Sequence, residues 1–130
     1  QNPLFKRIIN LYRMAFAVRC YKEGEDERIL EDYLDVLETD IHLLPTEQQK
    51  NLYTYARNFC ALKYKNGNIP YLGILFKLIQ KNLKAGFFYH KDGTTTDGIL
   101  HSSIQSIVAI ALKLEQADWA LNFLNEHKII

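Results

Sequence analysis

The chain has 130 residues, of which 48% are hydrophobic and 24% charged, a composition typical of one folded domain over residues 1–130. It excludes collagen-like, mucin-like and disordered proteins, and no apolar run approaches the roughly 18 residues that a membrane span needs. The formal net charge is +1, which by itself predicts no strongly charged partner.

The charges are nevertheless separated along the chain. Residues 23–40 hold nine acids and one base, whereas residues 50–91 hold eight bases and no acid. The nearly neutral protein is therefore an acidic segment joined to a basic one.

Apolar residues recur at intervals of three and four along most of the chain, which is the period of an α-helix. The pattern predicts helices over about 3–21, 26–43, 46–65, 70–86, 100–114 and 116–127. The first of them is apolar on most sides, so we expect neighbouring helices to cover it. The second has one apolar stripe with the acids opposite, as in a helix that packs on a core by one face.

Local signals mark the ends of these helices. Thr46 and Gln49 have the spacing of a capping box, and Asn66-Gly67 is typical of a helix C-terminus. Residues 87–98 form the longest connection, in which Asp92-Gly93 and Asp97-Gly98 are turn signals. A short hairpin through 87–89 is the alternative to an irregular loop there.

The six predicted helices group into three hairpins, over about 3–43, 46–86 and 99–128. An apolar helix that ends in a lysine-containing turn precedes Gly24, Gly67 and Glu115, which are 43 and 48 residues apart. Because one helical hairpin cannot bury its own apolar faces, stacking of similar hairpins builds a continuous core. The sequence therefore predicts an all-α fold of three stacked antiparallel helical hairpins, an αα-superhelix.

The last hairpin resembles a tetratricopeptide repeat. Val108 stands at the small-residue site of that family, Ala120 at its second-helix alanine and Leu124 at its following aromatic position. Residues 44–60 and 75–86 also resemble bacterial tetratricopeptide-like proteins. The repeat here is longer than the family's period, and Glu115 replaces the usual glycine.

This resemblance implies a tetratricopeptide-like solenoid segment that acts as a non-catalytic scaffold and binds a partner segment on its concave face. The apolar first helix and the two terminal isoleucines lack the polar faces that cap solenoids. We therefore expect either that the domain is excerpted from a longer array or that a partner or second copy covers its ends.

Catalytic and metal-binding patterns are not found. The sequence has no phosphate-binding glycine loop and no H-E-x-x-H or G-x-S-x-G motif, and its four histidines have no metal-ligand spacing. We predict no enzyme activity, no cofactor and no metal. Cys20 and Cys60 stand 40 residues apart in apolar surroundings, so we interpret both as reduced core residues of a cytoplasmic protein.

If Gly24, Gly67 and Glu115 occupy one repeat position, the first helix of each hairpin lines a common concave face. That alignment predicts these partner-binding residues: Tyr21, Lys22, Arg57, Tyr64, Lys65, Gln105 and Lys113. Lysines beside tyrosines suit an acidic peptide or a C-terminal carboxylate. Alternatively, a lysine in the last turn of a helix only complements the helix dipole.

The charged stripes have two interpretations. Lys77, Lys81 and Lys84 form one stripe, and the acids of the second helix, Glu27 to Glu38, form another, so that the two pair across the convex surface. The rival reading is an RNA-binding helical repeat, which the neighbouring acids and the near-zero net charge disfavour. A third alternative is a purely structural segment of a larger protein.

Overall fold

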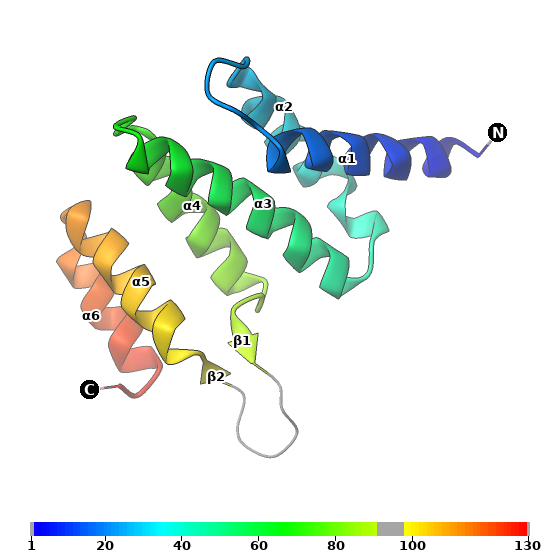
Figure 1. Cartoon of the computed structure of the whole chain (residues 1–130). Coiled ribbons are helices and arrows are strands. Elements are labelled where there is room, and N and C mark those ends of the chain that lie inside the picture. Colours follow the sequence, from blue (N-terminus) through cyan, green and yellow to red (C-terminus); the bar gives the residue numbers. More distant parts are fainter. Residues whose placement is uncertain (1, 91–97, 130) are drawn as a thin grey trace. The chain divides into compact units, whose positions relative to one another are not determined.

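The computed structural model describes residues 2–90 and 98–129. Over these residues the chain forms six α-helices, one 3₁₀ turn and one pair of two-residue strands, which confirms the predicted all-α class (Figure 1). The chain divides into two compact units, Gln1–Asn68 and Ile69–Ile130. The predicted turns at Asp92-Gly93 and Asp97-Gly98 fall largely on residues 91–97, which lie outside the described residues.

The first unit contains α1 (Pro3–Arg19), α2 (Arg28–Asp40), the 3₁₀ turn η1 (Ile41–Leu43) and α3 (Thr46–Lys65). Helix α1 packs on both α2 and α3 (Figure 1). It begins at a favourable cap, because the Asn2 side chain accepts a hydrogen bond from the Leu4 amide (2.9 Å) and Pro3 occupies the first helical position. The predicted second helix ends in the 3₁₀ turn rather than as an α-helix.

The core of the first unit is built from one face of each helix. Helix α1 contributes Leu11, Ala15 and Val18, α2 contributes Leu30, Tyr33 and Leu37, and α3 contributes Leu52, Ala56, Phe59 and Cys60. The Tyr33 ring is fully buried, and its hydroxyl donates a hydrogen bond to the Leu52 carbonyl oxygen (2.7 Å). This buried polar group is therefore satisfied and ties α2 to α3.

The second unit contains α4 (Tyr71–Lys84), strands β1 (Tyr89–His90) and β2 (Gly98–Ile99), α5 (His101–Lys113) and α6 (Ala117–Glu126). The strands pair antiparallel, with Tyr89 opposite Ile99. The short hairpin that the sequence offered as an alternative is therefore present, but its first strand begins at residue 89 and not at residue 87. Phe76, Ala111 and Ala120 form a core in which the alanines let α5 and α6 approach closely.

Four helices end in the same hydrogen-bonded cap. After α3, α4, α5 and α6 the chain turns through Gly67, Gly86, Glu115 and Lys128, all with positive φ. At α5, for example, the Gln116 amide donates to the Ala111 carbonyl oxygen (2.8 Å) and the Glu115 amide to that of Leu112 (3.0 Å). This is the Schellman arrangement, in which a left-handed residue satisfies the last carbonyl groups of the helix.

The repeat alignment is wrong in the first hairpin. Helix α1 ends at Arg19, so the position equivalent to Gly67 and Glu115 is Tyr21, three residues before Gly24. Gly24 instead lies in a separate turn, where the Glu25 amide donates to the Lys22 carbonyl oxygen (3.1 Å). The similarity of sequence around Gly24 therefore reflects a turn glycine and not a helix cap.

Two further local predictions are corrected. Pro45, with extended backbone, is the N-cap of α3, and no side chain caps this end; Gln49 donates to the Leu44 carbonyl oxygen (2.8 Å) instead of closing a capping box. Both cysteines are free, but only Cys60 is a core residue, whereas Cys20 is exposed just beyond the end of α1. Burial raises the pKa of the Cys60 thiol to about 12.

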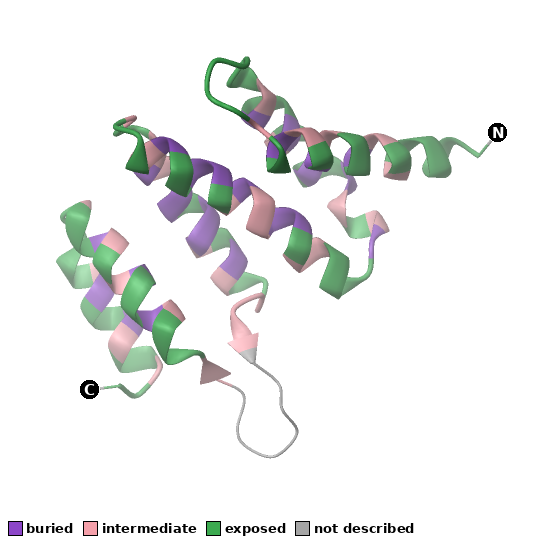
Figure 2. Cartoon of the chain, viewed as in Figure 1, coloured by how far each residue is buried: buried purple, intermediate pink, exposed green. Residues whose placement is uncertain are grey.

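Helix α1 is not covered on all sides, contrary to the expectation from its composition. Figure 2 shows exposed residues along its length. Among the described residues, no helix combines the length and the apolar character that crossing a bilayer requires.

Candidate functional site

The predicted partner-binding residues fall in both units. Tyr21, Lys22, Arg57, Tyr64 and Lys65 belong to the first unit, and Gln105 and Lys113 lie exposed on α5 in the second. Lys65 and Lys113 are each the last residue of a helix, as predicted. Lys22 is not, because it follows the end of α1 by three residues. A lysine therefore ends α3 and α5, whereas α1 ends at Arg19.

Tyr21, one of the predicted residues of the first unit, packs against α3. Its half-buried ring lies 4.6 Å from the ring of Phe59 on α3, and its hydroxyl donates to the Glu25 carbonyl oxygen (3.2 Å). Arg57 is half-buried and donates to the Thr54 hydroxyl (3.1 Å), and desolvation lowers its pKa. Tyr21 and Arg57 thus both contact other residues of the first unit.

Tyr21 also lines a small groove between α1 and α3. The groove has a volume of about 110 Å³, and its lining residues are Val18, Arg19, Tyr21, Tyr55, Asn58, Phe59 and Leu62. The guanidinium of Arg19 lies 5.5 Å from the centre of the Tyr55 ring, a cation–π distance. A groove of this size accommodates one small side chain and not a peptide.

Lys63 is a buried charge that the sequence analysis missed. Its ammonium group lies 2.8 Å from a carboxylate oxygen of Glu27 and 3.4 Å from Glu23, and it contacts both the hydroxyl and the ring face of Tyr21. The hydrogen bond that Lys63 donates to Glu27 raises the pKa of Lys63, so the lysine is charged at neutral pH and its contribution to stability is lost as it deprotonates in strong alkali. The sequence does contain one indication that Lys63 is buried: it follows Cys60 by three residues and so lies on the apolar face of α3.

This cluster gives part of the acidic segment a partner within its own unit. Glu23 and Glu27 neutralise Lys63 of α3, and at the other end of α2 the carboxylate of Asp40 pairs with Arg7 of α1 (2.6 Å). The predicted pairing of the acidic stripe with Lys77, Lys81 and Lys84 involves residues of different units and stays a prediction.

The most extensive exposed apolar feature lies on α1. Phe5, Ile9, Tyr12 and Phe16 are spaced by four, three and four residues, so they form one line along the helix. Their exposed fractions are 54%, 52%, 42% and 65%. We call these four residues the α1 stripe. Half of four side chains of roughly 200 Å² each leaves on the order of 400 Å² of apolar surface in contact with solvent.

The α1 stripe is accompanied by positive charge. Helix α1 contains four bases and no acid. Arg7 is paired with Asp40 and Arg19 lies over Tyr55, but Lys6 and Arg13 are exposed and form no ion pair with any residue in the described part of the chain. The stripe therefore has two basic side chains beside it.

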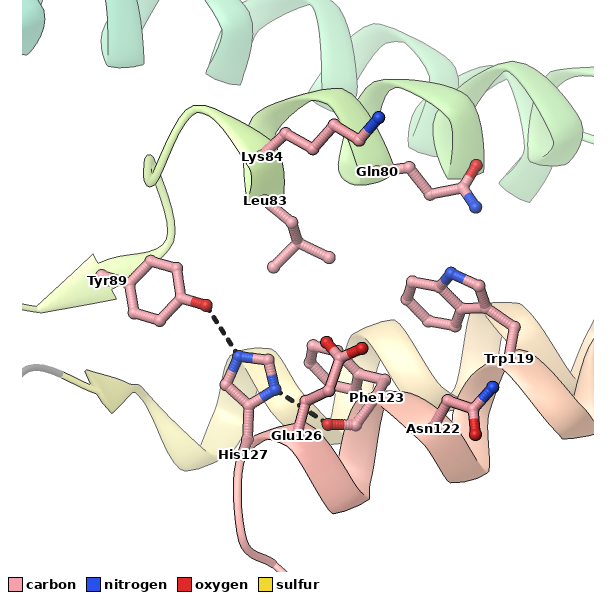
Figure 3. A pocket seen from close by; sticks show the side chains of 9 residues that line it. All are labelled: Gln80, Leu83, Lys84, Tyr89, Trp119, Asn122, Phe123, Glu126 and His127. Carbon is pink, nitrogen blue, oxygen red and sulfur yellow. Dashed lines mark hydrogen bonds between the residues drawn. The ribbon is translucent and has the colours of Figure 1, made fainter.

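A pocket in the second unit has a different character. It has a volume of about 400 Å³ and lies between α4 and α6, with Leu83 facing the aromatic residues of α6 (Figure 3). The lining residues are Gln80, Leu83, Lys84, Tyr89, Trp119, Asn122, Phe123, Glu126 and His127.

Hydrogen bonds and stacked rings hold the wall of this pocket. Because a carbonyl oxygen only accepts, Nδ1 of His127 donates to the Phe123 carbonyl oxygen (2.8 Å), and Nε2 of the same ring shares a hydrogen bond with the Tyr89 hydroxyl (2.8 Å; Figure 3). The rings of Trp119 and Phe123 stack with their centres 5.3 Å apart. No local sequence pattern predicts the contact between Tyr89 and His127, because these residues are 38 residues apart.

The pocket combines apolar and aromatic side chains with a few polar groups, as small-molecule binding sites do. Both nitrogens of His127 have hydrogen-bond partners, the Phe123 carbonyl oxygen and the Tyr89 hydroxyl, and the described lining residues include no serine, threonine or cysteine. Within the ranges 2–90 and 98–129, no three His, Cys, Asp or Glu side chains gather as metal ligands.

Comparison of the chain with protein-family models, with curated proteins and with solved structures finds no match.

Proposed function

We propose that this protein is a non-catalytic protein–protein interaction module of the tetratricopeptide-like type and that the α1 stripe is its principal binding surface. The observation that carries the proposal is the exposure of four large apolar side chains in one line on a well-anchored helix. Contiguous apolar patches of several hundred Å² on a soluble protein mark interaction surfaces, because leaving them in water is unfavourable.

The anchoring of α1 supports this role. The opposite face of the helix buries Leu11, Ala15 and Val18, and Arg7 pairs with Asp40. The backbone under the stripe is therefore already helical and anchored before a partner binds, which lowers the entropic cost of association. The helical hairpins α1–α2 and α5–α6 are consistent with a tetratricopeptide-like arrangement, which remains part of the proposal.

The expected affinity is modest. Burying about 400 Å² at about 25 cal/mol per Å² contributes roughly 10 kcal/mol before the cost of association, which consumes much of it. We expect a dissociation constant between about 10 µM and 1 mM for the stripe alone, which corresponds to roughly 4–7 kcal/mol of net binding free energy.

The test compares the proteins that the immobilised chain retains from a cell lysate with those retained by the Ile9→Asp/Phe16→Asp variant. A matched control is Leu112→Asp/Leu121→Asp, which makes the same change at apolar residues of similar exposure in the second unit. We expect the stripe variant to lose specific partners that the control keeps, with circular dichroism showing both folded. An identical set of retained proteins for all three chains would refute the proposal.

A second pair of variants tests the concave face predicted from the sequence. Tyr64→Ala/Lys65→Ala removes the half-buried tyrosine and the exposed lysine at the end of α3. If this variant loses the partners and the stripe variant keeps them, the binding surface is the predicted face and not the α1 stripe.

A further inference from the structure

The partner of the α1 stripe has a recognisable chemistry, and the inference that follows rests on the proposed function. Spacings of four, three and four residues are those of a coiled-coil seam, in which Ile9 and Phe16 occupy a positions and Phe5 and Tyr12 occupy d positions. A seam of this kind packs against another helix, because its knobs fit the holes formed by a facing a/d stripe. The shape of the surface thus selects an α-helix as the occupant.

The flanks of the seam are unequal. In the same register the g positions are Ile8 and Ala15, which are half-buried and buried within the protein's own first unit. The e positions are Lys6 and Arg13, both exposed. Residues at e and g positions contact the partner helix and set its charge preference. One side of the seam therefore belongs to the fold, and the other presents two positive charges to whatever binds.

A second copy of this chain does not fit that flank. In an antiparallel pair of α1 helices the e positions face one another, so Lys6 and Arg13 of each copy would approach the same two bases of the other. In a parallel pair each e position faces a g position, which here is apolar and partly covered. Like charges across an interface suppress pairing, so the arrangement selects against self-association and for a different partner.

We propose that the α1 stripe binds an amphipathic helix of another protein, one with a heptad apolar seam and acidic residues at the flank that faces Lys6 and Arg13. Burial of the apolar seam supplies most of the binding free energy, and the charges of Lys6 and Arg13 favour an acidic helix over a basic one. The absence of any acid on α1 leaves no competing attraction for a basic partner.

Two synthetic 28-residue peptides test this directly. Both carry leucine at all a and d positions, and they differ only at e and g, where one has glutamate and the other lysine. Binding of each labelled peptide to the full chain is followed by fluorescence anisotropy at low and at physiological salt. We expect the glutamate peptide to bind about tenfold more tightly, with the preference shrinking as salt rises.

Charge reversal provides the decisive control. The Lys6→Glu/Arg13→Glu variant keeps the α1 stripe and should invert the preference, so that the lysine peptide binds more tightly. The Ile9→Asp/Phe16→Asp variant should bind neither peptide, and circular dichroism reports whether each variant is folded.

The outcomes separate this inference from the proposed function. Equal binding of the two peptides to the wild-type chain would overturn the acidic partner and leave the apolar interaction surface in place. Binding of neither peptide, or a stable dimer of the wild-type chain in light scattering, would also overturn the inference. The proposed function fails in a different experiment: it is refuted if the immobilised chain retains the same proteins from a lysate before and after the α1 stripe is mutated.

Discussion

At the residue scale, an ion pair joins Lys63 of α3 to Glu23 and Glu27, the acids that precede α2. The side chain of Lys63 is 6% exposed, whereas those of Glu23 and Glu27 are 53% and 50% exposed. A buried charge is stabilised only while its partners remain, because the low-dielectric surroundings replace water poorly. The two sides of this pair therefore respond differently to mutation.

We predict that Glu23→Gln/Glu27→Gln destabilises the protein more than Lys63→Met does. The double variant leaves the ammonium group buried without carboxylates and should cost about 3 kcal/mol. Lys63→Met keeps the buried stem and lets both glutamates turn to solvent, so it should cost less than about 1 kcal/mol. Urea unfolding measures both, with Glu31→Gln as the control at an exposed acid of α2; equal losses would contradict the asymmetry.

The ion pair between Arg7 and Asp40 predicts an acid-dependent loss of stability. The hydrogen bond from Arg7 holds the pKa of Asp40 below its ordinary value of 3.8. A carboxyl with a lowered folded-state pKa contributes stability above its unfolded pKa and loses it as the pH falls through the folded one.

Arg7→Gln should therefore reduce the free energy of unfolding at pH 7 by roughly 1 kcal/mol, and its difference from wild type should shrink as the pH falls below the ordinary aspartate pKa of 3.8 and the carboxyl of Asp40 becomes protonated. Arg13→Gln, at an arginine of the same helix that has no carboxylate partner among the described residues, is the control and should follow the wild-type curve. The measurement is urea unfolding at several values between pH 2.5 and pH 7. A constant difference at every pH would show that the Arg7 effect is not electrostatic.

At the scale of the elements, the helix ends are decided by backbone conformation. Glu115 and Lys128 occupy the left-handed position that Gly67 and Gly86 occupy in the equivalent caps. A residue with a Cβ atom is strained there, whereas glycine is not. The cap hydrogen bonds after α5 still form, so the strain is accommodated without loss of the turn.

Glu115→Gly should stabilise the second unit by about 0.5–1 kcal/mol, because it relieves the strain while keeping the Schellman hydrogen bonds. Gly67→Ala is the reciprocal change and should destabilise the first unit by about 1 kcal/mol, since no atom within 4 Å of a Cβ there adds a packing effect. Thermal unfolding of the two variants tests the pair. A destabilised Glu115→Gly protein would mean that the glutamate side chain makes a compensating interaction.

At the scale of the whole molecule, each compact unit has its own buried residues. The first unit is built around Tyr33, Leu37 and Leu52, and the second around Phe76, Ala111 and Ala120. The single tryptophan, Trp119, packs edge-on against Phe76 in the second unit. Its fluorescence therefore reports on the second unit alone.

We predict that Leu37→Ala lowers the stability of the first unit by about 2–5 kcal/mol and leaves the Trp119 fluorescence transition nearly unchanged. Far-UV circular dichroism, which follows helices in both units, should then show an earlier transition that the fluorescence lacks. Coincident shifts of both signals would show that the two units unfold as one cooperative structure.

Much of the helical organisation follows from local sequence. The spacing of apolar residues predicts all six helices, and the limits of α3 match at both ends, because the Pro45 break and the Asn66-Gly67 cap are encoded within a few residues. The two-residue strands were harder to predict, because such short strands have no clear alternation of apolar and polar residues and their pairing joins Tyr89 to Ile99, which are ten residues apart in the sequence. The repeat alignment failed at Gly24 because a turn glycine and a cap glycine look alike in sequence.

The proposed binding surface likewise has some properties that follow from the sequence and others that depend on the fold. The sequence by itself determined that α1 is apolar on most sides and that all its charges are basic, since both are properties of composition and period. Only the tertiary structure decided which of those sides is exposed, because burial depends on where α2 and α3 pack against α1. It also decided that Lys63 meets Glu23 and Glu27, which precede it by 40 and 36 residues, because ion pairs between residues so far apart in the sequence form only once the chain has folded.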